Sequence, residues 1–150
     1  MMNKLRLALA IALMGPGLAN ADGWEIESNA DETVTASSDE AGNMFGVKCE
    51  NATTICMWAV KPLNGCGQAG EFTTTLITDG YPTPVKAQCL PAEGEDEAFV
   101  VFSDFEQISN VVASSKTVAF SAQDRFATGP IAVAGAAGAL QKMAKRFAKK

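Results

Sequence analysis

Apolar and polar residues alternate along much of the chain, which is the pattern of half-buried β-strands. The alternation is clearest from Met44 to Glu50 and from Ile55 to Val60, where apolar residues recur at every second position. Turn-forming residues separate such segments, and Asp79-Gly80-Tyr81-Pro82 is the strongest of these turn signals. The pattern predicts strands at 24–27, 33–35, 44–50, 55–60, 72–78, 85–90, 98–102, 117–121 and 131–134.

Apolar residues at helical spacing predict two helices. Ser103-Asp104-Phe105-Glu106 has the S-x-x-E form of a capping box, so we expect a short helix that starts there and ends near Ser114-Ser115. A second helix is expected from Ala136 to Lys149, where an alanine-rich apolar stripe lies opposite the lysines. Together these elements predict a mostly β (α+β) fold. We expect a small antiparallel β sandwich or barrel-like domain with a short internal helix and a C-terminal amphipathic helix.

The N-terminal residues have the three parts of a secretory signal peptide. Two cations lie within the first six residues, an apolar run from Leu7 to Met14 follows, and Ala19-Asn20-Ala21 has the A-x-A form of a cleavage site. The apolar run is too short to span a bilayer, which takes about 20 residues. We therefore expect residues 1–21 to be removed and residues 22–150 to form a single disulfide-bonded, β-rich domain.

Charge is unevenly distributed along the chain. With 17 acidic and 12 basic residues the net charge is −5, and loss of Lys4 and Arg6 with the signal peptide would make it 10 − 17 = −7. Half of the ten remaining cations lie in the last nine residues, and four of these five are on the second expected helix. The body before this helix is strongly acidic and repels nucleic acid, so we expect no nucleic-acid partner.

The basic C-terminal helix has two interpretations. It can contact a membrane surface or an acidic partner through its cations. Alternatively, the cations face water while the apolar stripe packs on the β-sheet. Leu140, Met143 and Phe147 are the only large side chains on that stripe, and the rest is mainly alanine. Such a helix favours close packing on the protein's own core, so membrane contact is the alternative.

The chain has an even number of cysteines: Cys49, Cys56, Cys66 and Cys89. In a protein that we expect to be exported, this favours two structural disulfides. Their separations of 7, 10 and 23 residues, with no histidine in the chain, do not fit a zinc site. A turn at 51–54 would place Cys49 opposite Cys56, close enough to bond, and leave Cys66 for Cys89. The other two connectivities of four cysteines stay open.

Histidine is absent, which removes most general acid–base, Ser-His-Asp, Cys-His and catalytic-zinc chemistry. A pair of carboxylates would still suffice for a glycosidase. Four carboxylates lie within the five residues from Glu93 to Glu97, and such a loop can bind a cation such as Ca²⁺. The segment lacks the sequence pattern of a calcium-binding loop, so we expect a solvated turn there. We therefore expect no catalytic residue, no metal site and no cofactor.

The order of several features resembles a known family. These are the N-terminal Trp24, the paired cysteines, Gln88-Cys89-Leu90-Pro91, the segment 102–108 (FSDFEQI) and the segment 130–135 (PIAVAG) before an alanine-rich helix. Over roughly residues 72–146 the chain is similar to the small exported bacterial proteins of the invasion-associated locus B type. The family often has a second cysteine shortly after the C-L-P segment, which this chain lacks. The resemblance implies a periplasmic, β-rich protein without known catalytic residues.

Two functions from different classes follow from the sequence. We expect an exported, non-enzymatic protein, periplasmic or secreted, that binds an unidentified protein or other component at the cell envelope or host surface. The missing histidine, the cysteines and the absence of a nucleophile motif favour this function. The alternative is a hydrolase that uses carboxylates alone and acts on cell-wall sugar. The sequence identifies no residues that would bind the partner.

Export with cleavage after Ala21 is the first testable prediction. Protein recovered from the periplasm or the culture medium should have the intact mass of a chain that begins at Asp22, because the A-x-A site directs cleavage there. Full-length protein that begins at Met1 and is recovered from the cytosol would contradict the prediction.

Overall fold

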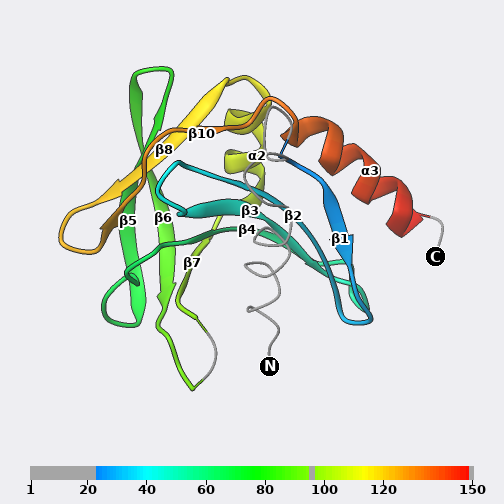
Figure 1. Cartoon of the computed structure of the whole chain (residues 1–150), viewed down its shortest axis with the longest axis horizontal. Coiled ribbons are helices and arrows are strands. Elements are labelled where there is room, and N and C mark those ends of the chain that lie inside the picture. Colours follow the sequence, from blue (N-terminus) through cyan, green and yellow to red (C-terminus); the bar gives the residue numbers. More distant parts are fainter. Residues whose placement is uncertain (1–22, 95–96, 149–150) are drawn as a thin grey trace.

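The structure is a computed structural model that describes residues 23–94 and 97–148, so the expected signal peptide lies outside it. In this part of the chain, ten strands and two helices are arranged as in Figure 1. The strands are β1 (Ile26–Ser28), β2 (Glu32–Ser38), β3 (Met44–Glu50), β4 (Cys56–Lys61), β5 (Gly70–Thr78), β6 (Tyr81–Leu90), β7 (Phe99–Phe102), β8 (Thr117–Ala122), β9 (Phe126–Ala127) and β10 (Ile131–Ala132). The helices are α2 (Phe105–Ala113) and α3 (Ala136–Ala148).

The strands form one antiparallel sheet that folds back on itself (Figure 1). Their order is β1-β2-β3-β4-β7-β6-β5-β8-β10, and β9 pairs with β8. Among the described strands β1 and β10 do not pair with each other, so the sheet stays open. The prediction of a mostly β, antiparallel domain with two helices is confirmed, and of the two expected arrangements the structure has the sandwich.

Four aromatic side chains in the interior join the two layers. Phe45 on β3 stacks on Trp58 of β4, with ring centroids 4.9 Å apart, and its centroid lies 5.0 Å from that of Phe120 on β8. Phe102 on β7 lies 5.1 Å from Phe120. All four side chains are buried, and burial of a large apolar side chain stabilises a fold by about 1.5–3 kcal/mol. Because β3 and β8 are distant in the sheet order, these contacts hold the layers together.

α2 starts one residue later than the capping-box pattern predicts. Its N-cap is Asp104, whose Oδ1 accepts a hydrogen bond from Gln107 N at 3.0 Å. Ser103 N instead donates to the carbonyl of Lys86 at 3.1 Å, which keeps Ser103 bound to β6. Bonding to the sheet therefore decides between two adjacent residues that are both able to cap a helix. The predicted end of this helix is confirmed, since Ser114 is its C-cap.

α3 packs its apolar stripe on the β core, as predicted. Ala136, Ala139 and Met143 are buried, and Leu140 and Phe147 are half-buried against the same core. The basic side chains of this helix are exposed. α3 therefore belongs to the folded domain and presents its cations to solvent.

The main differences between predicted and observed strands involve proline and very short strands. Pro82 is predicted in the turn after β5, but it pairs with Ile77 as part of β6. Only residues 87–90 of β6 pair with β7, so Pro82 lies where one side of β6 has no partner strand, a position at which sheets tolerate proline. The predicted strand at 131–134 covers only two residues, and the pattern does not predict β9 because two residues show no periodicity.

A buried carboxylate connects the β2–β3 turn to the segment before β10. Asp39 is 8% exposed and accepts hydrogen bonds from the backbone N–H groups of Gly42, Asn43 and Gly129 and from Asn43 Nδ2, all at 2.8–2.9 Å. Burial alone would raise the pKa of Asp39, but these hydrogen bonds outweigh burial and hold the pKa below its ordinary value. Because Gly129 lies 90 residues away in the sequence, Asp39 fixes a long-range contact.

Asp39→Asn should destabilise the protein by about 1–3 kcal/mol at pH 7, because an amide cannot accept all four hydrogen bonds and leaves buried donors unpaired. With a lowered folded-state pKa, the carboxylate stabilises the fold above the unfolded-state pKa of about 3.9. That contribution is lost as the pH falls through the folded-state pKa. In urea unfolding, the difference between variant and wild type should therefore be largest at neutral pH and shrink in acid.

The matched control for this prediction is Asp31→Asn, which makes the same substitution at an exposed aspartate. It should change the free energy of unfolding by less than about 0.5 kcal/mol. Equal destabilisation by the two variants, or a difference that does not depend on pH, would contradict the role given to Asp39.

Candidate functional site

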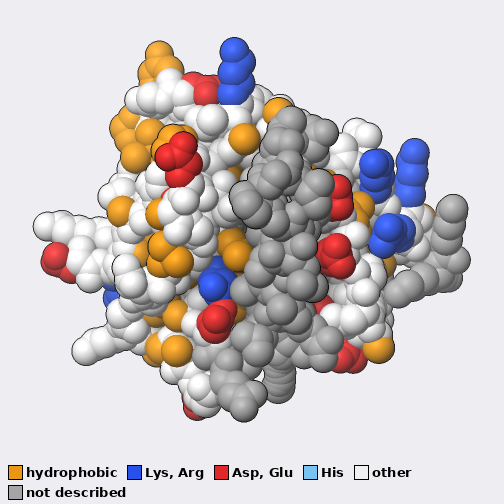
Figure 2. Space-filling view, in the orientation of Figure 1, with side chains coloured by type: hydrophobic (Ala, Val, Ile, Leu, Met, Phe, Trp, Pro, Cys, Tyr) orange, Lys and Arg blue, Asp and Glu red, His pale blue; other side chains and the backbone are white. Residues whose placement is uncertain are grey.

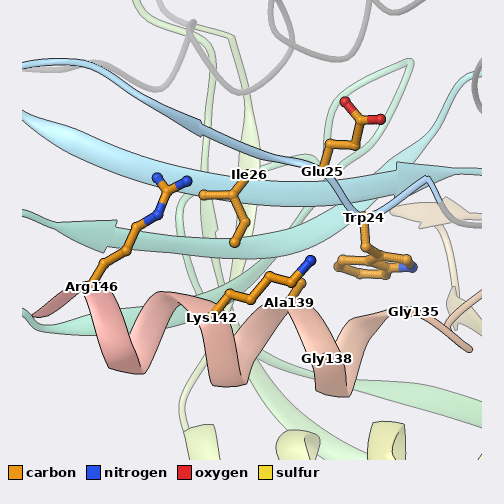
Figure 3. Close-up of a pocket in the computed structure, with 8 residues that line it drawn as sticks. All are labelled: Trp24, Glu25, Ile26, Gly135, Gly138, Ala139, Lys142 and Arg146. Atoms are coloured by element: carbon orange, nitrogen blue, oxygen red, sulfur yellow. The ribbon is translucent and has the colours of Figure 1, made fainter. Parts of the chain in front are cut away.

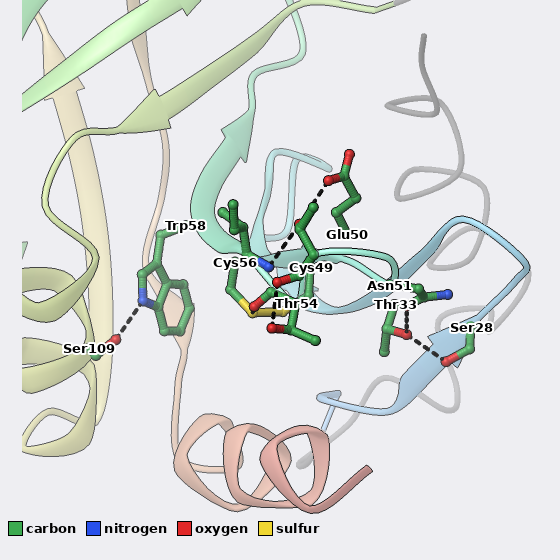
Figure 4. The surroundings of a disulfide bond; sticks show 11 residues. Ser28, Thr33, Cys49, Glu50, Asn51, Thr54, Cys56, Trp58 and Ser109 are labelled. Atoms are coloured by element: carbon green, nitrogen blue, oxygen red, sulfur yellow. Dashed lines mark hydrogen bonds between the residues drawn. A yellow bond between two sulfur atoms is a disulfide. The ribbon is translucent and has the colours of Figure 1, made fainter. Parts of the chain in front are cut away.

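The cysteines, which are the site residues predicted from the sequence, form both predicted disulfides. Cys49 and Cys56 face each other across β3 and β4, with Cα atoms 4.0 Å apart, in the register that the turn at 51–54 predicts (Figure 4). Cys66 and Cys89 join the loop before β5 to the end of β6, with Cα atoms 5.8 Å apart. Since no cysteine is free, the four residues are structural.

Hydrogen bonds hold the β3–β4 hairpin against β1 and β2 (Figure 4). Thr33 Oγ1 donates to Asn51 Oδ1 at 2.8 Å and lies 3.0 Å from Ser28 Oγ. Asn51 Nδ2 donates to the carbonyl of Asn29 at 2.8 Å. Both ends of the Asn51 amide thus hold β2 and the turn that connects it to β1, the strand that forms one wall of the groove described below.

The acidic segment 93–97 is only partly described, since Glu95 and Asp96 lie outside the described residues. Glu97 forms an ion pair with Lys61 at 2.9 Å. Within residues 23–94 and 97–148, no group of three or more Asp, Glu or Cys side chains is placed to hold a metal ion. The described acidic residues therefore provide no metal centre from which a function can be argued.

A groove of about 530 Å³ between β1 and α3 is the main candidate site. In Figure 3 the helix and the strand run side by side, with Trp24 at one end of the groove and Arg146 at the other. Trp24, Ile26 and Ala139 provide apolar surface along it. Its volume falls within the range of about 300–1,000 Å³ that is usual for ligand sites.

The groove is positively charged although the protein is acidic. Lys142 and Arg146 line it from α3, four residues apart and so on the same helix face (Figure 3). Among the lining residues Glu25 is the only acid, and its carboxylate points away from α3. Lys142 forms no ion pair with the rest of the described chain. Figure 2 shows the basic side chains of α3 gathered on one side of the molecule.

Hydrogen bonds between the two walls fix both ends of the groove. Trp24 Nε1 donates to the carbonyl of Ala132 at 2.9 Å, which ties the residues before β1 to the segment that leads into α3. At the other end, Arg146 Nη1 donates to Ser28 Oγ at 3.1 Å. Since side chains from both walls set its width, the groove is part of the folded domain.

Gly138 leaves the middle of the groove open. A Cβ atom at this position would have no heavy atom within 4 Å outside the helix's own backbone. Glycine inside a helix is less favourable than alanine by about 0.5–1 kcal/mol. The open space beside Lys142 is thus kept at a cost to helix stability, and it leaves the backbone of α3 uncovered at this point.

A second groove of about 430 Å³ lies beside the Lys61–Glu97 ion pair and is lined by loops, with Leu63 on one side and Gly94 on the other. Its lining residues Gly94 and Glu97 flank, in the sequence, the two residues that the structure does not describe. The described lining of the groove between β1 and α3 comes from these two elements and the residues directly before each of them, so this groove is the better-defined site.

The sequence predicts the two elements that form the main groove, but it does not predict that they lie side by side. The alternation at 24–27 predicts β1, and the basic stripe predicts the exposed cations of α3. The two walls are brought together by two hydrogen bonds, one between residues that are 108 positions apart and one between residues that are 118 positions apart. No local pattern in the sequence signals such contacts. The local signal that could have pointed to the groove is Gly138, because a glycine inside a helical pattern can mark a position that is left open.

Comparison of the chain with protein families, with curated proteins and with solved structures found no match in any of the three. The two disulfides indicate that the protein folds in an oxidising compartment outside the cytoplasm. Within the described ranges, neither helix is long and apolar enough to cross a membrane. The function is therefore argued from the geometry and chemistry of the groove.

Gly138→Ala should stabilise the protein by up to about 1 kcal/mol, because alanine favours a helix and its methyl group would enter open space. The guanidinium chloride midpoint should rise with an unchanged slope. Gly46→Ala is the contrasting variant, since its Cβ would overlap the Thr35 carbonyl and Ala36, and it should destabilise the protein. Destabilisation by Gly138→Ala would contradict an open groove at this position.

Proposed function

We propose that this chain is an exported, non-enzymatic protein of the periplasm or cell surface that binds another macromolecule at the cell envelope or host surface. The observation that carries the proposal is the groove between β1 and α3, which combines apolar surface with two cations, Lys142 and Arg146. Among the described residues that line it, no nucleophile is paired with a base, so the groove suits binding better than catalysis.

Three further observations support export. The two disulfides require an oxidising compartment to persist. The sequence of residues 1–21 has the form of a cleavable signal peptide. The resemblance to the invasion-associated locus B type of exported bacterial protein implies the same compartment and a β-rich domain without known catalytic residues.

The alternative function, a carboxylate-dependent hydrolase acting on cell-wall sugar, has less support. A glycosidase needs two carboxylates about 5–9.5 Å apart that flank the substrate. Among described residues, the main groove is lined by one acid, Glu25, whose carboxylate points away from α3 (Figure 3). Of the described residues, one acid lines the second groove, Glu97, which is paired with Lys61. In the described part of the chain, neither groove therefore offers a carboxylate couple.

Membrane contact through α3 also has less support. A helix that lies on a bilayer inserts its apolar face among the lipid chains. Met143 and Ala139 of α3 are instead buried in the protein core, and Leu140 and Phe147 pack against it. The exposed face of α3 carries its cations and only small or polar uncharged residues, which favours a partner recognised by charge and by the groove.

Photo-crosslinking in living cells tests this proposal. A photoreactive residue in place of Gly138 would project into the groove, where we expect it to capture a discrete macromolecular partner from the envelope. The control carries the same photoreactive residue in place of Tyr81, which is 76% exposed at the β5–β6 turn, away from α3 (Figure 1). Capture should be specific to position 138 and should be lost when Lys142 and Arg146 are both changed to glutamine.

The outcome separates the candidate functions. Equal capture at positions 138 and 81, or no capture at position 138, would contradict a binding groove. Release of soluble sugar from purified peptidoglycan by the wild-type protein, reduced at least about 100-fold by Glu25→Gln or Glu97→Gln, would establish the hydrolase instead. An inactive wild-type protein in this assay, together with capture at position 138, is the expected result.

A further inference from the structure

Among the described strands, β1 is an edge strand with no partner on its outer side. It pairs with β2 alone, and it is the first strand in the sheet order. In an antiparallel pair, alternate residues direct their N–H and C=O groups away from the partner strand. Among described residues, no backbone hydrogen bond from 25–28 to a segment other than β2 occurs. β1 therefore presents unused donors and acceptors at the mouth of the groove, the arrangement to which an extended peptide can add as a further strand.

The two faces of β1 differ in charge. Ile26 and Ser28 are two residues apart and so lie on the same face, and both are directed toward α3, since Ile26 lines the groove and Ser28 Oγ accepts a hydrogen bond from Arg146. Glu25 and Glu27 lie on the opposite face. A strand added beside β1 would place its own alternate side chains on the α3 face, next to Ile26 and Ser28.

The cations on α3 have the spacing of alternate residues in such a strand. Lys142 and Arg146 are four residues apart, a rise of about 6 Å along a helix. Two residues of an extended strand span about 6.8 Å. α3 and β1 run side by side in both Figure 1 and Figure 3. Two carboxylates separated by one residue in an added strand would therefore meet the two cations.

We infer that the groove binds an extended acidic segment of a protein partner. The segment pairs its main chain with the open edge of β1 and directs two carboxylates, in the pattern acid-x-acid, toward Lys142 and Arg146. The open space at Gly138 gives that chain room to approach α3. This inference rests on the proposed binding function and specifies the chemistry of the partner.

Other occupants fit the groove less well. A second copy of the chain, paired edge to edge through β1, would bring the basic side chains of both α3 helices together, and like charges repel. The carboxylates of its β1, on Glu25 and Glu27, would lie on the face away from those cations. An anionic membrane would meet the cations but would leave the open edge of β1 without hydrogen-bond partners.

Binding of synthetic peptides to the purified protein tests the inference. The probe is a heptapeptide with blocked ends, glutamate at its third and fifth positions and threonine or valine elsewhere. Its control is an isomer with glutamates at the third and fourth positions, which has the same charge but directs the carboxylates to opposite faces of a strand. NMR titration should show shifts in the β1 amides, with the alternating peptide binding about two- to fivefold more tightly than the isomer.

Protein and peptide variants separate strand addition from simple charge attraction. Lys142→Gln should weaken the alternating peptide about two- to fivefold, while Lys116→Gln, a change outside α3, should leave its affinity unchanged. N-methylation of alternate peptide amides on the side that faces β1 should abolish binding without changing charge, because it removes main-chain donors.

Each contrary outcome overturns the inference. These outcomes are equal binding of the two isomers, shifts confined to residues outside β1 and α3, or unchanged binding after N-methylation. Concentration-dependent dimerisation of the protein that the alternating peptide prevents would assign the groove to a second copy. Tighter binding to phosphatidylglycerol vesicles than to the peptide, lost in Lys142→Gln, would assign it to a membrane.

The peptide experiment tests the inferred partner chemistry and the crosslinking experiment tests the proposed binding function, and each can fail without the other. If position 138 captures a partner in cells but the alternating peptide neither binds nor competes, the binding function stands and the acidic strand does not. If the peptide binds as expected but no partner is captured, the chemistry of the groove stands and the proposed function does not.

Discussion

The contact of Phe45 with Trp58 and Phe120 is the constraint on which the rest of the structure depends. An open sheet of ten short strands has two exposed faces unless it folds over and buries one of them. Aromatic pairs of this kind stabilise by about 0.5–1.5 kcal/mol beyond the area that they bury. Trp58 also donates a hydrogen bond through Nε1 to Ser109 Oγ at 2.8 Å, so α2 is attached to the same cluster.

The position of the groove follows from the way in which Trp24 completes this aromatic cluster. Trp24 packs edge-on against both Phe45 and Trp58, with ring centroids 6.1 and 6.3 Å away, while its indole N–H is bonded to Ala132. One side chain thus sets the position of β1 relative to the core and the point from which α3 starts. A site built in this way gains rigidity from the core, which reduces the ordering cost of binding.

Local sequence information was sufficient for the hairpins and helices and insufficient for the arrangement of the layers. A turn at 51–54 fixes Cys49 opposite Cys56 because register follows from turn length. The capping residue of α2 was misplaced by one position, since the bond from Ser103 to β6 is a tertiary contact. The sheet order, in which β4 pairs with β7 and β5 with β8, arises between distant segments, and so does the hydrogen bond from Gly129 to Asp39. The same is true of the groove, whose residues have ordinary local patterns.

The two walls of the groove come from opposite ends of the sequence, and this has a consequence for the order of folding. Hairpins such as β5–β6 close over a few residues, whereas contacts such as that between Ser28 and Arg146 require closure over 118 positions and form late. The groove is therefore complete only at the end of folding. A chain that has lost the last turns of α3 also loses Arg146 and one end of the groove. An intact groove thus reports that both ends of the domain are present and have been brought together.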